Sequence, residues 1–423
     1  MLGWAANGRF HFFVPTRQAV QTLQQLFEIA GVRAGVQDLF TLARLLSLGT
    51  FGWPVFLTAS CWFMLPRSEK PWIIGPLLNF IAVIPATSFF GIGEGIIASC
   101  LLWLLFLTFT FWVHETWGAI ATLVMIAICA FSYEAAFLFM ACLSVLALQR
   151  AGRSTAGQWE RKTCLVVALV AAIASIHLLL WVVVPRSTIE RSNYIVSLLG
   201  QFLGTVTAPN LPAIAGICAL AAIPVLIRQN AGSMLSKLLI VGLCALYFLM
   251  LVLLIVLPGE MIQPSRYFAA RGLPIIFTTA AAVGMYLLRE RGFAPQSLAK
   301  PAVWAVLAPL LVIQFVFQIA MSSLWQEFVS DLKGVVANQT GVISFADASR
   351  LLNPANSRFR RELLNSWSIE SLSIVLAPHG QVQSVVAPAQ SEPWLPYLLR
   401  DPRTLPHVPG LDWSRWFPRR KIT

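Results

Sequence analysis

The feature that most constrains this chain is a series of apolar runs, each about 20 residues long, that recurs between residues 46 and 324. A helix of about 20 apolar residues matches the thickness of a bilayer, and it satisfies its own backbone hydrogen bonds inside lipid. The chain is 57% hydrophobic and only 11% charged, whereas a soluble domain carries about 25% charged residues. The sequence therefore predicts an all-α polytopic membrane protein.

The spans can be placed from the lengths of these runs. Clear candidates lie at 46–65, 72–90, 96–113, 163–184, 210–227, 236–257, 272–288 and 302–324. The run 117–149 is too long for one span and contains S-Y-E at 132–134. We expect it to divide into two short spans with Glu134 at the turn, which brings the total to about ten transmembrane helices.

The distribution of Lys and Arg predicts the orientation of the spans. One set of alternate loops holds Arg67, Lys70, Arg150, Arg153, Arg161, Lys162, Arg228, Lys237, Arg289, Arg291 and Lys300. The other set holds only Arg186, Arg191, Arg266 and Arg271. Cytoplasmic loops are richer in positive residues, so the first set is expected in the cytoplasm and the second outside. The net charge of +12 is explained in this way, and no basic stretch interleaved with aromatic residues predicts nucleic-acid binding.

Residues 1–45 are expected to form an N-terminal amphipathic, interfacial segment ahead of the bundle at 46–325. The stretch 16–30, T-R-Q-A-V-Q-T-L-Q-Q-L-F-E-I-A, predicts a helix suited to lying on the membrane surface. The same loop count puts both ends of the chain outside. We therefore expect either a further span ahead of residue 1 in the native protein or a cytoplasmic N-terminus with a re-entrant helix.

Residues 326–423 differ in composition and predict a small α+β domain on the periplasmic side, ending in a Pro/Trp-rich tail. The segment W-Q-E-F-V-S-D-L-K-G-V-V is typical of an amphipathic helix. Three segments are typical of short strands, namely G-V-I-S-F, S-L-S-I-V-L-A and V-Q-S-V-V-A.

Several kinds of chemistry have no signature in the sequence. The chain has no P-loop, no G-x-S-x-G, no H-E-x-x-H and no dinucleotide fingerprint. The seven cysteines all fall inside apolar runs, without a C-x-x-C pair or neighbouring histidines. They are expected to be small buried side chains, so no metal site is predicted and no cofactor is indicated.

Acidic residues near the outer membrane boundary are the candidate catalytic groups. Glu94 stands between two glycines in T-S-F-F-G-I-G-E-G, and Glu134 and Asp38 map to the same side. A carboxylate inside or beside a membrane needs a partner, a wet pocket or a function. Glu94 and Glu134 are expected to line the site, with one of them or Asp38 as general base. The alternative for Glu94 is that it caps a helix or pairs with an arginine across the bundle.

The outer loop P-G-E-M-I-Q-P-S-R-Y-F-A-A-R is the candidate substrate-binding segment. Arg266 and Arg271 could hold a phosphate or pyrophosphate bidentately, with Glu260 and Tyr267 beside them. A salt bridge between Glu260 and Arg266 is the structural alternative.

This arrangement resembles the membrane-embedded glycosyltransferases of the GT-C type. The resemblance covers the architecture of most of the chain: many spans, interfacial helices, acidic residues at the outer boundary and a C-terminal outer domain. It does not extend to a motif. The family usually carries an Asp/Glu pair in its first outer loop, and the acidic residues nearest that region here are Glu28 and Asp38.

The resemblance implies transfer of a sugar from a polyprenyl-phosphate donor at the outer face of a bacterial inner membrane. The alternative is a non-enzymatic subunit or scaffold of a larger membrane complex, with an aromatic tail that docks to protein partners or lipid. A transporter is disfavoured because no inverted repeat and few mid-membrane polar residues are found.

Overall fold

The computed structural model describes most of the first half of the chain and part of the second. The described residues are 10, 15–36, 38–82, 94–153, 157–183, 234, 241–242, 245, 249, 273–339, 341–352, 369–376 and 384–386. The chain divides into two compact units. Unit 1 comprises Met1–His11, Gln24–Gly49 and Gln318–Thr423, and unit 2 comprises Phe12–Leu23 and Thr50–Phe317.

The described part is mostly helical. The principal helices are α2 (Gln18–Arg33), α3 (Leu39–Met64), α4 (Ile74–Ala82), α6 (Glu94–Trp112), α7 (Thr116–Ala130), α8 (Phe137–Ala151), α9 (Gln158–Val183), α14 (Leu273–Glu290) and α15 (Pro301–Asn338). Short 3-10 turns precede or join them at η1 (Pro15–Arg17), η2 (Arg67–Ile73), η3 (Glu134–Ala136) and η4 (Pro295–Ala299).

Four of the described helices are long and apolar enough to cross a membrane, namely Phe40–Met64, Glu94–Trp112, Glu134–Ala151 and Gln158–Trp181. The prediction of a helical membrane protein is supported to that extent. The count of about ten spans stays a prediction, since the runs 210–227 and 236–257 lie almost entirely outside the described residues.

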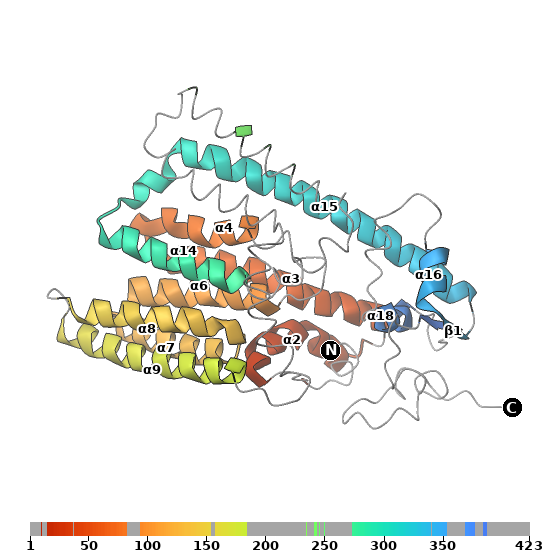
Figure 1. Ribbon diagram of the computed structural model, residues 1–423, viewed down its shortest axis with the longest axis horizontal. Helices are drawn as coiled ribbons and strands as arrows, with labels where there is room; N and C mark the ends of the chain where they lie inside the picture. Colours follow the sequence, from red (N-terminus) through yellow and green to blue (C-terminus); the bar gives the residue numbers. More distant parts are fainter. Residues whose placement is uncertain are drawn as a thin grey trace. The chain divides into compact units, whose positions relative to one another are not determined.

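Helix α6 forms the centre of unit 2, where α6, α7, α8, α9 and α14 run side by side (Figure 1). It is apolar on all sides and buried along almost its whole length, as expected for a helix without a polar face. Trp103 of α6 lies against Gly75 of α4, where a Cβ atom would come within 2.6 Å of the indole ring. The glycine therefore makes room for a buried tryptophan of the core.

The long run 117–149 is broken as predicted. Helix α7 ends at Ala130, the chain turns at 131–133, and η3 begins at Glu134. Each half is then a helix of 15 residues, with η3 leading into α8. The polar triplet S-Y-E supplies the turn because it cannot continue an apolar span without burying unpaired groups.

Helix α9 has large apolar residues on its outward face and small residues on its inward face, as helices in membranes do. Its outward face carries Val166, Leu169 and Ile173 with exposed fractions of 47%, 63% and 58%. The inward face carries small residues such as Ala168, Ala171 and Ala174. Ser144 of α8 donates to the Ala168 carbonyl oxygen at 2.9 Å. Small residues let two helices approach closely in lipid, where burial of large apolar groups gives no advantage.

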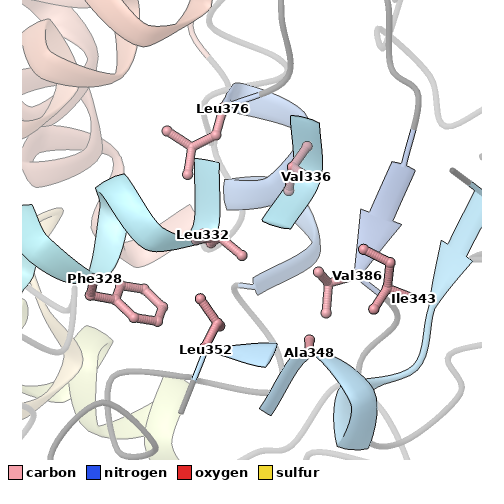
Figure 2. Packing of buried hydrophobic residues seen from close by; sticks show 8 residues of the cluster. All are labelled: Phe328, Leu332, Val336, Ile343, Ala348, Leu352, Leu376 and Val386. Carbon is pink, nitrogen blue, oxygen red and sulfur yellow. The ribbon is translucent and has the colours of Figure 1, made fainter. Parts of the chain in front are cut away.

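Unit 1 has a core of its own, built around the C-terminal half of α15. Figure 2 shows the cluster formed by Phe328, Leu332, Val336, Ile343, Ala348, Leu352, Leu376 and Val386. Strands β1 (Gly341–Ile343) and β2 (Ser384–Val386) pair in parallel, with Ile343 opposite Val386. Helices α16 (Phe345–Leu351) and α18 (Ile369–Leu376) lie between them in the chain.

Strands β1 and β2 each cover three residues of two of the predicted strand segments, whereas the prediction of a third strand is wrong. The segment S-L-S-I-V-L-A lies largely in α18. Leu376 of α18 belongs to the core and Leu372 packs against it, which is the four-residue spacing of a helical face. The predicted amphipathic helix after residue 325 is not separate, because α15 runs unbroken from Pro301 to Asn338. An α+β domain over all of 326–423 stays a prediction.

The tight approach of α6 and α7 gives a stability prediction. A Cβ atom on Gly118 would lie 2.0 Å from the Trp112 carbonyl oxygen, whereas one on Gly284 meets nothing within 4 Å. We expect Gly118→Ala to destabilise the protein by about 1–3 kcal/mol through overpacking. Gly284→Ala should be neutral or slightly stabilising. Unfolding by SDS titration measures both, and equal stability of the two variants would contradict the packing.

Candidate functional site

A buried arginine joins the two acidic residues singled out in the sequence. Arg17 Nη1 lies 2.6 Å from Oε2 of Glu94, and Arg17 Nε lies 3.0 Å from both carboxylate oxygens of Glu134. The three side chains are only 10%, 7% and 6% exposed. One guanidinium is thus shared between two carboxylates that come from different apolar helices.

Two neutral side chains complete these contacts. Thr16 Oγ1 donates to Oε1 of Glu134 at 3.0 Å, and Gln21 Nε2 donates to Oε1 of Glu94 at 2.9 Å. The Arg17 guanidinium also lies over the Tyr133 ring, 4.7 Å from its centroid, in the geometry of a cation–π contact. We call Thr16, Arg17, Gln21, Glu94 and Glu134 the Arg17 cluster.

Local structure explains how these groups meet. Glu94 is the first residue of α6, and Glu134 is the first residue of η3. The first amides of a helix lack backbone acceptors, so the start of a helix favours a carboxylate. Arg17 ends η1 and Gln21 follows one turn later on α2. The Ala19 amide donates to the Phe131 carbonyl oxygen at 2.8 Å, which holds the start of α2 against the turn before η3.

The two carboxylates of the Arg17 cluster lie at the starts of their helices. Two of the four candidate spans begin at Glu94 and Glu134, and both of these residues contact Arg17. The two spans therefore start at the same end of unit 2. Charged groups in membrane proteins are stable where they pair with one another or face the bundle interior, and here they do both.

The other predicted site residues are not brought to this cluster by the described structure. Asp38 lies in unit 1 at the start of α3, where its carboxylate accepts from the Thr41 amide at 2.9 Å and from the Thr41 hydroxyl at 2.5 Å. It acts there as a helix cap. Glu260, Arg266, Tyr267 and Arg271 lie outside the described residues.

Sequence reasoning missed Arg17, Thr16, Gln21 and Tyr133. A signal existed in the N-terminal helix, where Arg17, Gln21, Gln24, Gln25 and Glu28 recur at helical spacing on one face. On the predicted helix at the membrane surface, this stripe would face water or lipid headgroups. In the structure all five residues are buried, so the polar face of α2 is its buried face.

No metal-binding group stands out among the described residues. They contain no set of three or more His, Cys, Asp or Glu side chains placed to hold a metal ion. The described cysteines are free thiols and four of the five are buried, and none lies in the Arg17 cluster.

The chain matches no family model, no curated protein and no solved structure. Its function is therefore inferred from the geometry of the cluster and from its place in the fold.

A third buried carboxyl group lies on α2 within unit 1. Glu28 is fully buried, and neither of its carboxylate oxygens has a hydrogen-bond partner among the described residues. The side-chain oxygen of Gln24, one turn earlier, is also without one. Burial raises the pKa of Glu28 from its ordinary value of 4.5 to about 9, because an apolar environment penalises the charged form.

The Arg17 cluster predicts a large effect of removing its cation. Arg17→Gln leaves two carboxylates buried at one place, and we expect the free energy of unfolding to fall by about 3–5 kcal/mol. Arg33→Gln, an exposed position at the end of α2, is the matched control and should be near neutral. SDS titration measures both. A near-neutral Arg17→Gln would show that the cluster does not stabilise the fold.

Glu28 predicts a pH dependence of stability. The pKa of Glu28 is near 9 in the folded protein and 4.5 in the unfolded chain. Between these pH values the folded protein therefore binds more protons than the unfolded chain does. The stability that protonated Glu28 contributes is complete below about pH 4.5 and is lost as the pH rises toward 9. Glu28→Gln should therefore gain stability relative to the natural protein as the pH rises from 5 to 9, by at most about 1.4 kcal/mol per pH unit. Parallel pH profiles of the two proteins would refute the assignment.

Proposed function

We propose that the protein is a GT-C-like membrane glycosyltransferase that moves a sugar from a polyprenyl-phosphate donor at the outer face of a bacterial inner membrane. One observation carries the proposal. Glu94 and Glu134, far apart in the sequence, meet on Arg17 at the starts of two apolar helices. A pair of carboxylates held at a membrane boundary is suited to a reaction between a lipid-linked donor and a hydroxyl acceptor.

Glu94 is the better placed of the two to act as general base. Its Oε1 accepts from the neutral amide of Gln21, whereas both oxygens of Glu134 accept from the charged Nε of Arg17. Both bonds have a carboxylate acceptor, but the guanidinium also carries a full positive charge, so it is held more strongly than the neutral amide. An acceptor hydroxyl can therefore replace Gln21 at Glu94 at lower cost than it could replace Arg17 at Glu134.

The reaction then follows ordinary group-transfer chemistry. Glu94 takes the hydroxyl proton while the hydroxyl oxygen bonds to the anomeric carbon of the sugar, and the bond from that carbon to the lipid phosphate breaks. Thr16 donates to Glu134, Glu134 binds Arg17, and Arg17 in turn orients Glu94. Arg266 and Arg271 are proposed to bind the phosphate, with Glu260 and Tyr267 beside them, and Asp38 is the alternative base.

The topology belongs to the same proposal. About ten spans follow from the lengths of the apolar runs, and the α+β domain follows from the composition of residues 326–423. The outer location of that domain and of the Arg17 cluster follows from the Lys/Arg distribution. The basic residues at the other end of the described helices, where α8 ends and α9 begins, agree with that orientation.

A second candidate is a non-enzymatic subunit of a larger membrane complex. It is favoured by the observation that Thr16, Arg17 and Gln21 already occupy the carboxylates of Glu94 and Glu134. On this alternative the Arg17 cluster is a structural lock between the N-terminal helix and two spans. The exposed apolar faces of α3 and α9 would contact lipid and neighbouring subunits.

Sugar transfer in Glu94→Gln tests the proposal. We expect the rate of transfer from a polyprenyl-phosphate sugar to fall about 10²–10⁴-fold, the usual contribution of a general base. Elution as a single monodisperse species in detergent confirms that the variant is folded. Glu327→Gln, an exposed position on α15, should keep full activity.

Full transfer activity in folded Glu94→Gln would remove Glu94 from the mechanism. Absence of transfer in the natural protein, together with its purification in a stable stoichiometric assembly, would favour the second candidate.

A further inference from the structure

One end of unit 2 gathers the ends of six helices. Here α3, α6, α8 and α14 end, and α7 and α9 begin. Trp112 Nε1 donates to the Met64 carbonyl oxygen at 2.6 Å, which joins the ends of α6 and α3. Arg150 Nη1 donates to the carbonyl oxygens of Phe109 and Thr110 at 3.1 and 2.7 Å. These are among the last carbonyls of α6, which favour a cation. We call this region the basic end.

The carboxylates at the basic end are engaged by neighbouring groups. Glu160 binds Arg150 at 2.6 Å, and Glu290 binds Arg153. Glu69 accepts from the indole of Trp72 at 2.8 Å, and Glu115 accepts from the indole of Trp117. All four of these carboxylates are partly buried.

Four cations at this end are more exposed than these four carboxylates. Arg67, Arg161, Lys162 and Arg291 are all exposed. Ion pairs therefore neutralise the interior of the basic end, while its surface carries an excess of positive charge.

Three tryptophans are exposed in the same region. Trp62 near the end of α3, Trp117 near the start of α7 and Trp159 near the start of α9 have exposed fractions of 45%, 46% and 54%. Trp side chains at the ends of apolar helices are typical of the boundary between lipid tails and headgroups.

The outward face of α9 carries both exposed cations and exposed apolar side chains. Trp159 and Lys162 are followed at helical spacing by Val166, Leu169 and Ile173, all of them exposed. Arg161 lies beside Lys162 in the first turns of the helix. The rise of 1.5 Å per residue places about 10–17 Å of apolar surface next to the two cations. This is about the depth of one leaflet of hydrocarbon.

We propose that this face of α9 is a binding site for an anionic phospholipid, with the headgroup phosphate at Arg161 and Lys162 and an acyl chain along Val166, Leu169 and Ile173. An acidic protein or a nucleic acid would match the cations but not the aliphatic stripe. A zwitterionic lipid would match the stripe but would gain less from the cations. The site is distinct from the Arg17 cluster and does not depend on the proposed transfer reaction.

Native mass spectrometry of the full chain in detergent tests the site. Phosphatidylglycerol and phosphatidylcholine are titrated separately, and the apparent Kd of the first bound lipid is measured. The natural protein should bind phosphatidylglycerol more tightly. R161Q/K162Q should raise the Kd for phosphatidylglycerol by up to about fivefold for each cation removed and leave the Kd for phosphatidylcholine unchanged.

The matched control is R33Q/K333Q, which removes one arginine and one lysine from exposed positions in unit 1. It should keep the lipid preference of the natural protein. Equal affinity of the natural protein for both lipids would overturn the proposal. An equal loss of phosphatidylglycerol affinity in both double variants would also overturn it, since a diffuse charge effect would then suffice.

Discussion

The described part of unit 2 depends on one buried guanidinium. Arg17 holds the starts of α6 and η3 together through Glu94 and Glu134, and it brings the first turn of α2 with it. An unpaired buried charge costs several kcal/mol, so the charged residues of the Arg17 cluster lower the free-energy cost of burying one another. The proposed reaction uses the same arrangement, because a base at the membrane boundary must be held without being fully screened by water.

Charged side chains are stabilised in different ways at the two ends of unit 2. At the Arg17 cluster the charges are buried and one arginine serves two acids. At the basic end each paired acid has its own arginine or indole, and Arg67, Arg161, Lys162 and Arg291 are exposed. Between the two ends α9 packs through small residues, and α6 fills the core with large apolar side chains. This division suits a protein whose one end holds a reactive group and whose other end contacts lipid headgroups.

Sequence reasoning recovered the helices better than the site. It placed Glu94 and Glu134 near one boundary, and it placed the break at 132–134 correctly, because span length and turn residues are local properties. It assigned S-L-S-I-V-L-A to a strand, since a short apolar run fits either period until its packing partners are known. It turned the polar face of α2 outward, because an amphipathic pattern does not specify which face meets the protein.

The sequence by itself determined that the chain is helical, that its apolar runs are long enough to span a bilayer, and that carboxylates occur where spans begin. Only the tertiary structure decided which cation those carboxylates meet. Arg17 is separated from Glu94 by 77 residues and from Glu134 by 117, and such contacts depend on how helices pack rather than on any local pattern. The length and polarity of a helix can be predicted from its own sequence. Which helix it packs against depends on which buried charges can be paired.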